Sequence, residues 1–242
     1  MAILLNGGIA IDAVFLDAGE TLIYPEPPVG TVYSSVAARY GVFIAPDEME
    51  RLFRMRWREL VEETRRCPEK YLHPPDPSGR QWWRILVDRI MSGKGPALYD
   101  RMFEELYEYY AHGSAWSMYP DVKPAIEALC SARVHLGVIS NWDSRLEKLL
   151  SALGLADSFQ SVTISSYEGY LKPHPAIFRA ALAKAGVMAE RAILVGDRPA
   201  EDVDGARAAG MIPILLDRRG EQTANCLTIT SLAQLPPMLG LE

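Results

Sequence analysis

Cysteine and histidine are scarce in this sequence, which limits the metal and disulfide sites it can build. Its 242 residues include only three cysteines and four histidines. Cys67, Cys130 and Cys226 are far apart and form no CxxC pair, a pattern typical of a reducing compartment and not of a zinc site. We therefore predict that the cysteines are buried small apolar groups and that the histidines carry no chemistry.

An excess of basic charge and a long hydrophobic run are also missing. Twenty-five basic and thirty-one acidic residues give a net charge of −6, which disfavours binding to the phosphate backbone of a nucleic acid. The apolar start, residues 2–5, ends at Asn6 and is far too short for a leader or a membrane span. We expect a cytoplasmic protein without nucleic-acid or membrane partners, and the sequence carries no sign of its oligomeric state.

What is present is a regular alternation of two patterns. Short apolar runs typical of buried strands cover residues 11–17, 134–140, 192–197 and 212–216. Helical patterns cover residues 121–132, 143–153, 175–185, 200–209 and 232–239. The alternation predicts an α/β fold, a Rossmann-like parallel sheet with helices on both faces. Ligands of such sheets bind at the carboxyl ends of the strands, where Asp17, Ser140 and Asp197 lie.

Residues 24–114 differ in character from the rest of the chain. Strand signals vanish there, and helical patterns cover residues 29–40, 47–66, 78–91 and 97–111. The second of these has its apolar residues on one face, as a helix of a bundle requires. We predict that residues 24–114 form an inserted four-helix cap domain, that residues 1–23 and 115–242 form the core, and that residues 25–28 and 113–120 are the linkers.

Four polar elements follow the strands in order along the chain. They are Asp17-Ala18-Gly19-Glu20-Thr21, Ser140-Asn141, Lys172-Pro173, and a Gly-Asp-x4-Asp motif from Gly196 to Asp202. Each alone has an ordinary explanation, such as a helix cap, a turn hydroxyl or a surface lysine. Together they resemble the haloacid dehalogenase superfamily over nearly the whole chain, with a cap inserted after the first motif. Residues 140–146 and 171–175 are similar to its subgroup of haloacid dehalogenase-like hydrolase domain-containing proteins.

The resemblance implies a magnesium-dependent hydrolase that acts on a small phosphorylated molecule. Asp17 would be the nucleophile, and it would bind Mg²⁺ together with Asp197 and the main-chain carbonyl of Gly19. Asp202 would bind the metal directly or through water. Magnesium prefers six oxygen ligands and retains water, which suits carboxylates, a carbonyl and a phosphate.

The resemblance also assigns residues to the phosphoryl group. Ser140 and Lys172 would be catalytic, because a hydroxyl donor and a fixed positive charge offset the charge of the transferred group. These two residues, with Thr21 and Asn141, would bind the substrate. The cap residues carry no readable signature of which substrate that is.

Gly19 departs from the pattern of the superfamily. Phosphatases of the superfamily usually carry a second Asp at this position, which protonates the leaving group and later activates water. A positioned acid–base residue typically contributes ~10²–10⁴ in rate. Three explanations compete: the leaving group needs no proton, as in an acyl phosphate; Glu20 takes over the role; or the chemistry is different.

Two other chemistries and one binding function stay open. Haloacid dehalogenases also lack the second Asp, but they work without magnesium, so the presence of both Asp197 and Asp202 favours a metal enzyme. Phosphonatases need a cap lysine that forms a Schiff base. The cap lysines here, Lys70 and Lys94, lie in loop-like contexts, which disfavours phosphonatase chemistry. A protein that binds a phosphorylated ligand with little turnover would also keep these residues.

Overall fold

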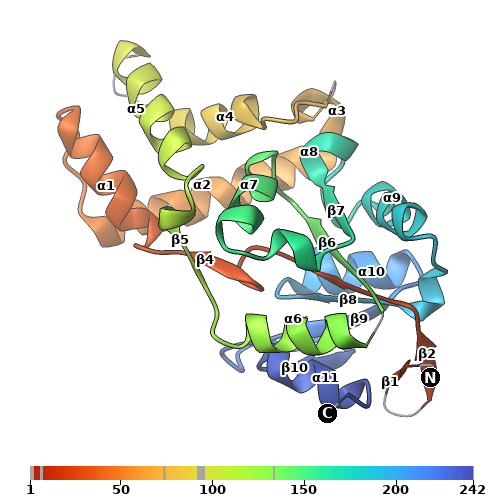
Figure 1. Cartoon of the computed structure of the whole chain (residues 1–242). Coiled ribbons are helices and arrows are strands. Elements are labelled where there is room, and N and C mark those ends of the chain that lie inside the picture. Colours follow the sequence, from red (N-terminus) through yellow and green to blue (C-terminus); the bar gives the residue numbers. More distant parts are fainter. Residues whose placement is uncertain (1–2, 6–7, 73–74, 92–95, 133, 242) are drawn as a thin grey trace.

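A six-stranded parallel sheet forms the centre of the computed structural model, which describes residues 3–5, 8–72, 75–91, 96–132 and 134–241. The strand order is β10-β9-β8-β3-β6-β7 (Figure 1). The strands are β3 (Ala13–Leu16), β6 (His135–Ser140), β7 (Ser161–Ile164), β8 (Ala192–Gly196), β9 (Ile212–Leu216) and β10 (Leu227–Ile229). The predicted α/β fold is therefore confirmed.

Helices cover both faces of this sheet. Successive residues of a strand point to opposite faces, so each strand supplies side chains to both layers of helices. Val14 and Leu16 of β3 face one apolar cluster, which includes residues of α6 (Val122–Ser131), α7 (Arg145–Ala152) and α11 (Leu235–Met238). Ala13 and Phe15 face the other, with α9 (Pro175–Ala185) and α10 (Gly205–Ala208). Burial on both faces explains why β3 reads as a continuous apolar run.

Several elements differ from those predicted. The expected strand over residues 11–17 is interrupted at Asp12, whose backbone N–H donates to the Arg191 carbonyl. Residues before it form β2 (Ile9–Ile11), which pairs antiparallel with β1 (Ile3–Leu5). The expected helix 200–209 is a π-helical turn, η4 (Pro199–Asp204), followed by α10. The expected helix 232–239 is divided into the 3₁₀ turn η5 (Leu232–Gln234) and α11, which follow each other directly, since Pro236 and Pro237 lack the N–H that one continuous α-helix would use.

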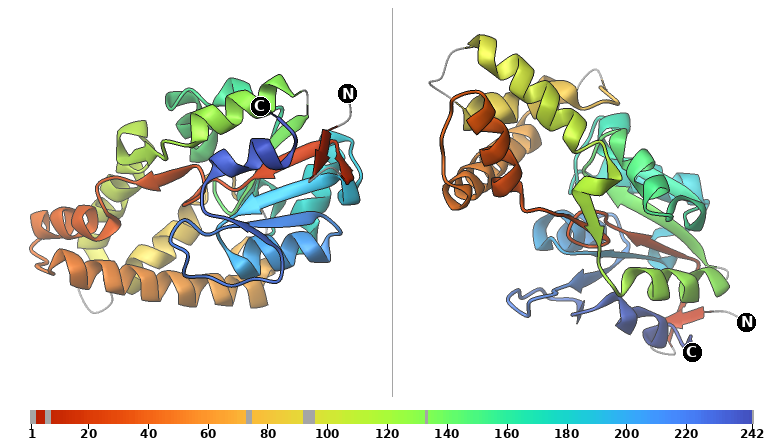
Figure 2. Two further views of the ribbon diagram at one scale, coloured as in Figure 1. Left: turned by 90° about the horizontal axis from the view of Figure 1, so that it is seen from below. Right: turned by 60° about the vertical axis from the view of Figure 1, so that its left-hand side comes forward.

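A set of helices is inserted between β4 (Ile23–Pro25) and β5 (Trp116–Met118), two strands that pair antiparallel. We call this set the helical insertion; it comprises α1 (Val29–Arg39), α2 (Pro46–Arg66), α3 (Pro68–Tyr71), α4 (Arg80–Ile90) and α5 (Pro96–Tyr109). It has its own apolar cluster and lies to one side of the sheet (Figure 2). The short α3 was not predicted, and the division of the chain at residues 24–114 into a separate domain stays a prediction.

Two further expectations from composition can be compared with the structure. No described helix is both long enough and apolar enough to cross a bilayer. The prediction of buried cysteines was wrong, because Cys67 and Cys130 are exposed and Cys226 is only partly buried. Cys67 directly follows the last residue of α2, and Cys130 lies on the outer side of α6, so neither position faces an apolar cluster.

Candidate active site

Three of the predicted site residues meet because their strands are neighbours. β3 lies between β6 and β8, with Leu16 opposite Val138 on one side and Val195 on the other. Asp17 follows β3, Ser140 ends β6, and Asp197 follows β8. The carboxyl ends of adjacent parallel strands lie at one edge of a sheet, so the side chains converge there.

Asp17 is held by two donors on the same carboxylate oxygen. The Ser140 hydroxyl donates to Asp17 Oδ1 at 2.9 Å, and Lys172 Nζ donates to Asp17 Oδ1 at 2.7 Å. The backbone N–H of Asp17 donates to the Val195 carbonyl at 2.9 Å. Within the described parts of the chain, no group donates to Asp17 Oδ2. This arrangement orients the carboxylate and leaves one oxygen open to a metal or a phosphorus atom.

Lys172 is a buried cation between two carboxylates. Its Nζ donates to Asp17 Oδ1 at 2.7 Å and to Asp202 Oδ1 at 2.5 Å, and the residue is 2% exposed. Burial alone would lower the pKa of Lys172, but Asp17 and Asp202 outweigh it and raise that pKa above its ordinary value. The site therefore contains a permanent positive charge beside Asp17.

Asn141 bonds to the main chain of Lys172 through both of its amide atoms. Its Oδ1 accepts from the Lys172 backbone N–H at 2.6 Å, and its Nδ2 donates to the Lys172 carbonyl at 3.2 Å. Asn141 therefore fixes the loop that presents Lys172. Its predicted role in substrate binding stays a prediction.

Three carboxylates come together beside this single lysine. One oxygen each of Asp17, Asp197 and Asp202 can be chosen so that all lie within 4.8 Å of one another. Asp197 Oδ1 is buried without a hydrogen-bond partner among the described residues. Burial, followed by the charges of Asp17 and Asp202, raises the pKa of Asp197 to about 8. Burial also raises the pKa of Asp202 to about 6, although Lys172 opposes that shift.

These observations fit a divalent cation. Buried carboxylates are costly unless they are paired or bind a metal, and the buried Lys172 ammonium and the exposed Arg198 guanidinium are two cations against three carboxylates. Oxygen ligands in this number suit Mg²⁺. The predicted contributions of the Gly19 carbonyl and of Asp202, directly or through water, stay predictions.

The turn that presents Asp197 and Asp202 depends on Gly196. A Cβ on Gly196 would lie 2.2 Å from the carboxyl carbon of Asp202, closer than real contacts allow. The Arg198 backbone N–H donates to Asp202 Oδ2 at 2.9 Å, and Arg198 Nε pairs with Asp197 Oδ2 at 3.1 Å. The glycine therefore lets the Asp202 side chain return toward the end of β8 and reach Lys172.

An aromatic side chain stands beside Gly19. A Cβ built on Gly19 would lie 3.2 Å from Cζ3 of Trp142, the residue that follows Ser140 and Asn141. The Trp142 ring packs on Trp116 of β5, with ring centroids 4.9 Å apart. Sequence reasoning did not assign Trp142 a role. A large aromatic residue next to the polar end of a strand was the available signal.

Side chains from outside the sheet bond to the rest of the loop after Asp17. Glu20 adopts a φ of 58°, in the left-handed region, and its Oε2 accepts from the Tyr119 hydroxyl at 3.0 Å. Thr21 is fully buried, and among the described residues its hydroxyl has no hydrogen-bond partner, while its carbonyl accepts from Arg218 at 2.8 Å. The predicted contact of Thr21 with substrate stays a prediction.

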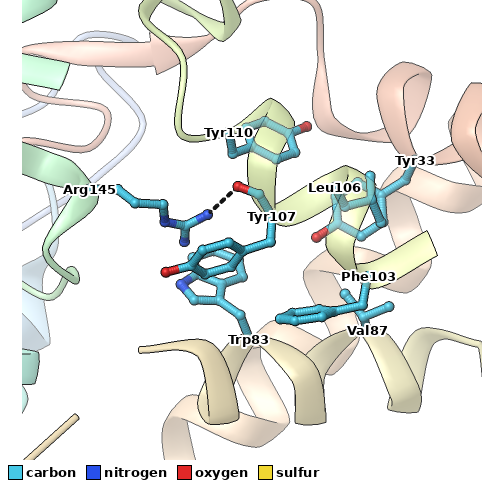
Figure 3. A pocket seen from close by; sticks show the side chains of 8 residues that line it. All are labelled: Tyr33, Trp83, Val87, Phe103, Leu106, Tyr107, Tyr110 and Arg145. Carbon is cyan, nitrogen blue, oxygen red and sulfur yellow. Dashed lines mark hydrogen bonds between the residues drawn. The ribbon is translucent and has the colours of Figure 1, made fainter. Parts of the chain in front are cut away.

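A second buried group joins the core to the helical insertion. Arg145 of α7 pairs with Asp143 at 2.7 Å and donates to the Tyr107 carbonyl of α5 at 3.1 Å, beside a cavity of about 20 Å³ (Figure 3). Trp83 of α4 donates to Asp143 Oδ2 at 2.7 Å. Asp143 and Arg145 are both buried. This contact was not predicted, because the partners lie in segments that the sequence pattern treats separately.

Comparison with known proteins agrees with the motif pattern. The family of haloacid dehalogenase-like hydrolases matches residues 11–210. Haloacid dehalogenase-like hydrolase domain-containing protein 3 of Danio rerio is 29% identical over 234 residues, 93% of this chain and 95% of that protein. A phosphoserine phosphatase of Thermus thermophilus is 36% identical over 121 residues, 49% of this chain and 48% of that protein.

Solved structures with the same fold include enzymes of two kinds. A HAD phosphatase from Thermococcus onnurineus has a TM-score of 0.68 at 25% identity and covers 96% of this chain and 99% of its own. A 2-haloacid dehalogenase from Pseudomonas syringae pv. Tomato DC3000 has a TM-score of 0.66 at 29% identity and covers 95% of this chain and 98% of its own.

Proposed function

This chain belongs to the haloacid dehalogenase-like hydrolases, and we propose that it is a magnesium-dependent phosphatase of a small phosphorylated metabolite. The observation that carries the proposal is the cluster of Asp17, Asp197 and Asp202, in which Asp197 Oδ1 is buried without a partner among the described residues. A cluster of this kind is suited to Mg²⁺, and Mg²⁺ is suited to phosphate oxygens.

Asp17 would act as the nucleophile and form an aspartyl-phosphate. Its free oxygen would attack phosphorus, while Ser140 and Lys172 orient its other oxygen and stabilise charge on the phosphoryl group. Bound by Asp17, Asp197 and Asp202, Mg²⁺ would supply charge neutralisation for the approach of a carboxylate to a phosphate dianion. Water would then release phosphate from Asp17.

The names of two similar proteins support phosphate as the group transferred. They are the phosphoserine phosphatase of Thermus thermophilus and the HAD phosphatase of Thermococcus onnurineus. The first matches only half of this chain, so it supports the reaction class more than the substrate.

The experiment is a phosphate-release assay with and without Mg²⁺ on the wild type, Asp17→Asn and Asp12→Asn. Asp12 is a matched control because it precedes the same strand at the opposite end and pairs with Arg191 at the surface. We expect Mg²⁺-dependent turnover that Asp17→Asn abolishes and Asp12→Asn preserves. Equal turnover in both variants would refute the proposal. If Mg²⁺ with a phosphate mimic raises Tm while turnover stays undetectable, the chain is a binding protein instead.

A 2-haloacid dehalogenase is the second candidate. The Pseudomonas syringae structure and the absence of a carboxylate at Gly19 favour it. The acids Asp197 and Asp202 disfavour it, because halide displacement from carbon needs no cluster of acids around Asp17. Release of chloride from 2-chloropropionate in the presence of a chelator would establish this alternative and exclude the phosphatase.

A further inference from the structure

A leaving group would lie on the side of Asp17 that faces away from the sheet. Displacement at phosphorus places the leaving group opposite Asp17, beyond the edge of the sheet. The loops that follow β3 and β6 extend in that direction, since they leave the carboxyl ends of those strands. These loops carry Gly19, Glu20 and Trp142, and a side chain there could give a proton to the leaving group.

Trp142 narrows the space beside Gly19. Its Cζ3 lies 3.2 Å from a Cβ built on Gly19, so a carboxylate there would need a shift of the indole. The indole packs on Trp116, and the Trp142 carbonyl accepts from the Ser165 hydroxyl at 3.0 Å and the Ser166 N–H at 3.2 Å. Trp142 is therefore held in place against Gly19.

The polar groups nearest to this space already have partners. Glu20 accepts from the Tyr119 hydroxyl, Ser140 donates to Asp17, and Arg198 pairs with Asp197. Lys172 is bonded to two carboxylates that keep its proton in place. Among the described residues around Asp17, the acids are therefore bonded to these donors or, in the case of Asp197 Oδ1, belong to the cluster that would hold the metal.

We propose that Trp142 leaves little room beside Asp17 for a side chain that could donate a proton. The enzyme therefore acts on phosphates whose leaving groups depart as stable anions: acyl, enol or aryl phosphates. This inference rests on the proposed phosphatase function. An Asp17 oxygen bonds to phosphorus as the bond from phosphorus to the leaving oxygen breaks, and the electron pair leaves with that oxygen. A carboxylate, enolate or phenolate carries the pair without a proton, whereas an alkoxide is too strong a base. Water then attacks phosphorus, its proton passes to bulk solvent, and Asp17 leaves as a carboxylate.

The first test is the dependence of turnover on the leaving group. We would measure kcat/KM of the Mg²⁺-loaded wild type for acetyl phosphate, 4-nitrophenyl phosphate, phenyl phosphate and O-phosphoserine. The expected result is a fall of at least ~10²-fold from 4-nitrophenyl to phenyl phosphate and a further fall to O-phosphoserine, because a positioned acid would supply ~10²–10⁴. Similar rates across the series would overturn this inference and leave the phosphatase standing. No turnover of any member would defeat both.

The second test inserts the missing acid. Gly19→Asp should raise O-phosphoserine turnover far less in the wild type than in Trp142→Ala, because the indole would have to shift to admit the new side chain. Gly19→Asp combined with Trp142→Ala should raise it at least tenfold above Trp142→Ala alone, part of the ~10²–10⁴ that such a group supplies. An equally large gain in O-phosphoserine turnover from Gly19→Asp alone would overturn the role of Trp142. So would the absence of a gain in the double variant, provided that its Tm matches that of Trp142→Ala.

Discussion

The two sides of Asp17 are built from opposite kinds of residue. On one side, Lys172, Asp197 and Asp202 form a buried set of charges that a metal would complete. On the other side, the Trp142 ring lies against Gly19 and packs on Trp116. Under the proposed function, the charged side would direct attack on phosphorus, and the aromatic side would determine which leaving groups can depart. The predictions below test that separation, beginning with the largest expected effect.

Replacing Lys172 with Met should cause the largest loss. It would leave Asp17 and Asp202 buried without their cation, and breaking a buried pair typically costs about 3–5 kcal/mol of the free energy of unfolding. Urea denaturation without metal measures this loss, and turnover should disappear as well. Lys184→Met is the control, because Lys184 is 40% exposed and pairs with Glu168, so its loss should be below about 1 kcal/mol. Comparable losses in the two variants would show that Lys172 does not balance the charges.

Gly196→Ala should disturb the charged side without removing any charge. The added Cβ would collide with the Asp202 carboxyl group and displace it from Lys172. We expect Mg²⁺ affinity to fall roughly 10–100-fold, as for loss of groups that orient metal ligands. Calorimetric titration with Mg²⁺ measures this, with Gly8→Ala as the control, since the nearest atom to a Cβ there is 3.8 Å away. Unchanged affinity would mean that Asp202 is not needed at the metal.

The stability of the metal-free protein should fall as pH rises from about 4 to about 8. Asp197 has its pKa raised to about 8 by burial and by Asp17 and Asp202, so over this range the unfolded chain loses a proton that the folded chain keeps. The folded state therefore binds more protons, and the free energy of unfolding decreases with pH. Thermal unfolding in a chelator measures the trend. Asp197→Asn should flatten it, and a rise in stability over the same range would contradict it.

Glu20→Gln should have the smallest effect. The Glu20 carboxylate already accepts from Tyr119, so we expect kcat/KM for 4-nitrophenyl phosphate to change less than about tenfold, below the ~10²–10⁴ of a positioned acid–base group. Tyr119→Phe is the companion variant, because it frees the carboxylate without removing it. A loss of 10²-fold or more in Glu20→Gln, with one limb of the pH–rate profile gone, would make Glu20 the acid–base residue.

The sequence predicted the central strands well because their signal is local. β3, β6, β8 and β9 are buried on both faces, and that burial appears as continuous apolar runs. β7 and β10 were not predicted, since each is short and is partly exposed at an edge of the sheet. The helix expected over residues 200–209 becomes a π-helical turn, a deviation that goes with the return of Asp202 to Lys172. No local pattern contains that long-range contact.

The candidate site divides in the same way. The order of Asp17, Ser140, Lys172 and the Gly-Asp-x4-Asp motif along the chain carried the family resemblance, and that resemblance implied a hydrolase and its metal ligands. Strand ends converge in any parallel sheet, so the sequence also placed Asp17, Ser140 and Asp197 at one edge. Only the tertiary structure decided that Trp142 lies against Gly19, that Glu20 bonds to Tyr119, and that Asp143 and Arg145 join the core to the helical insertion. These contacts depend on how loops from separate elements pack. Side-chain packing across loops has no sequence period that could reveal it.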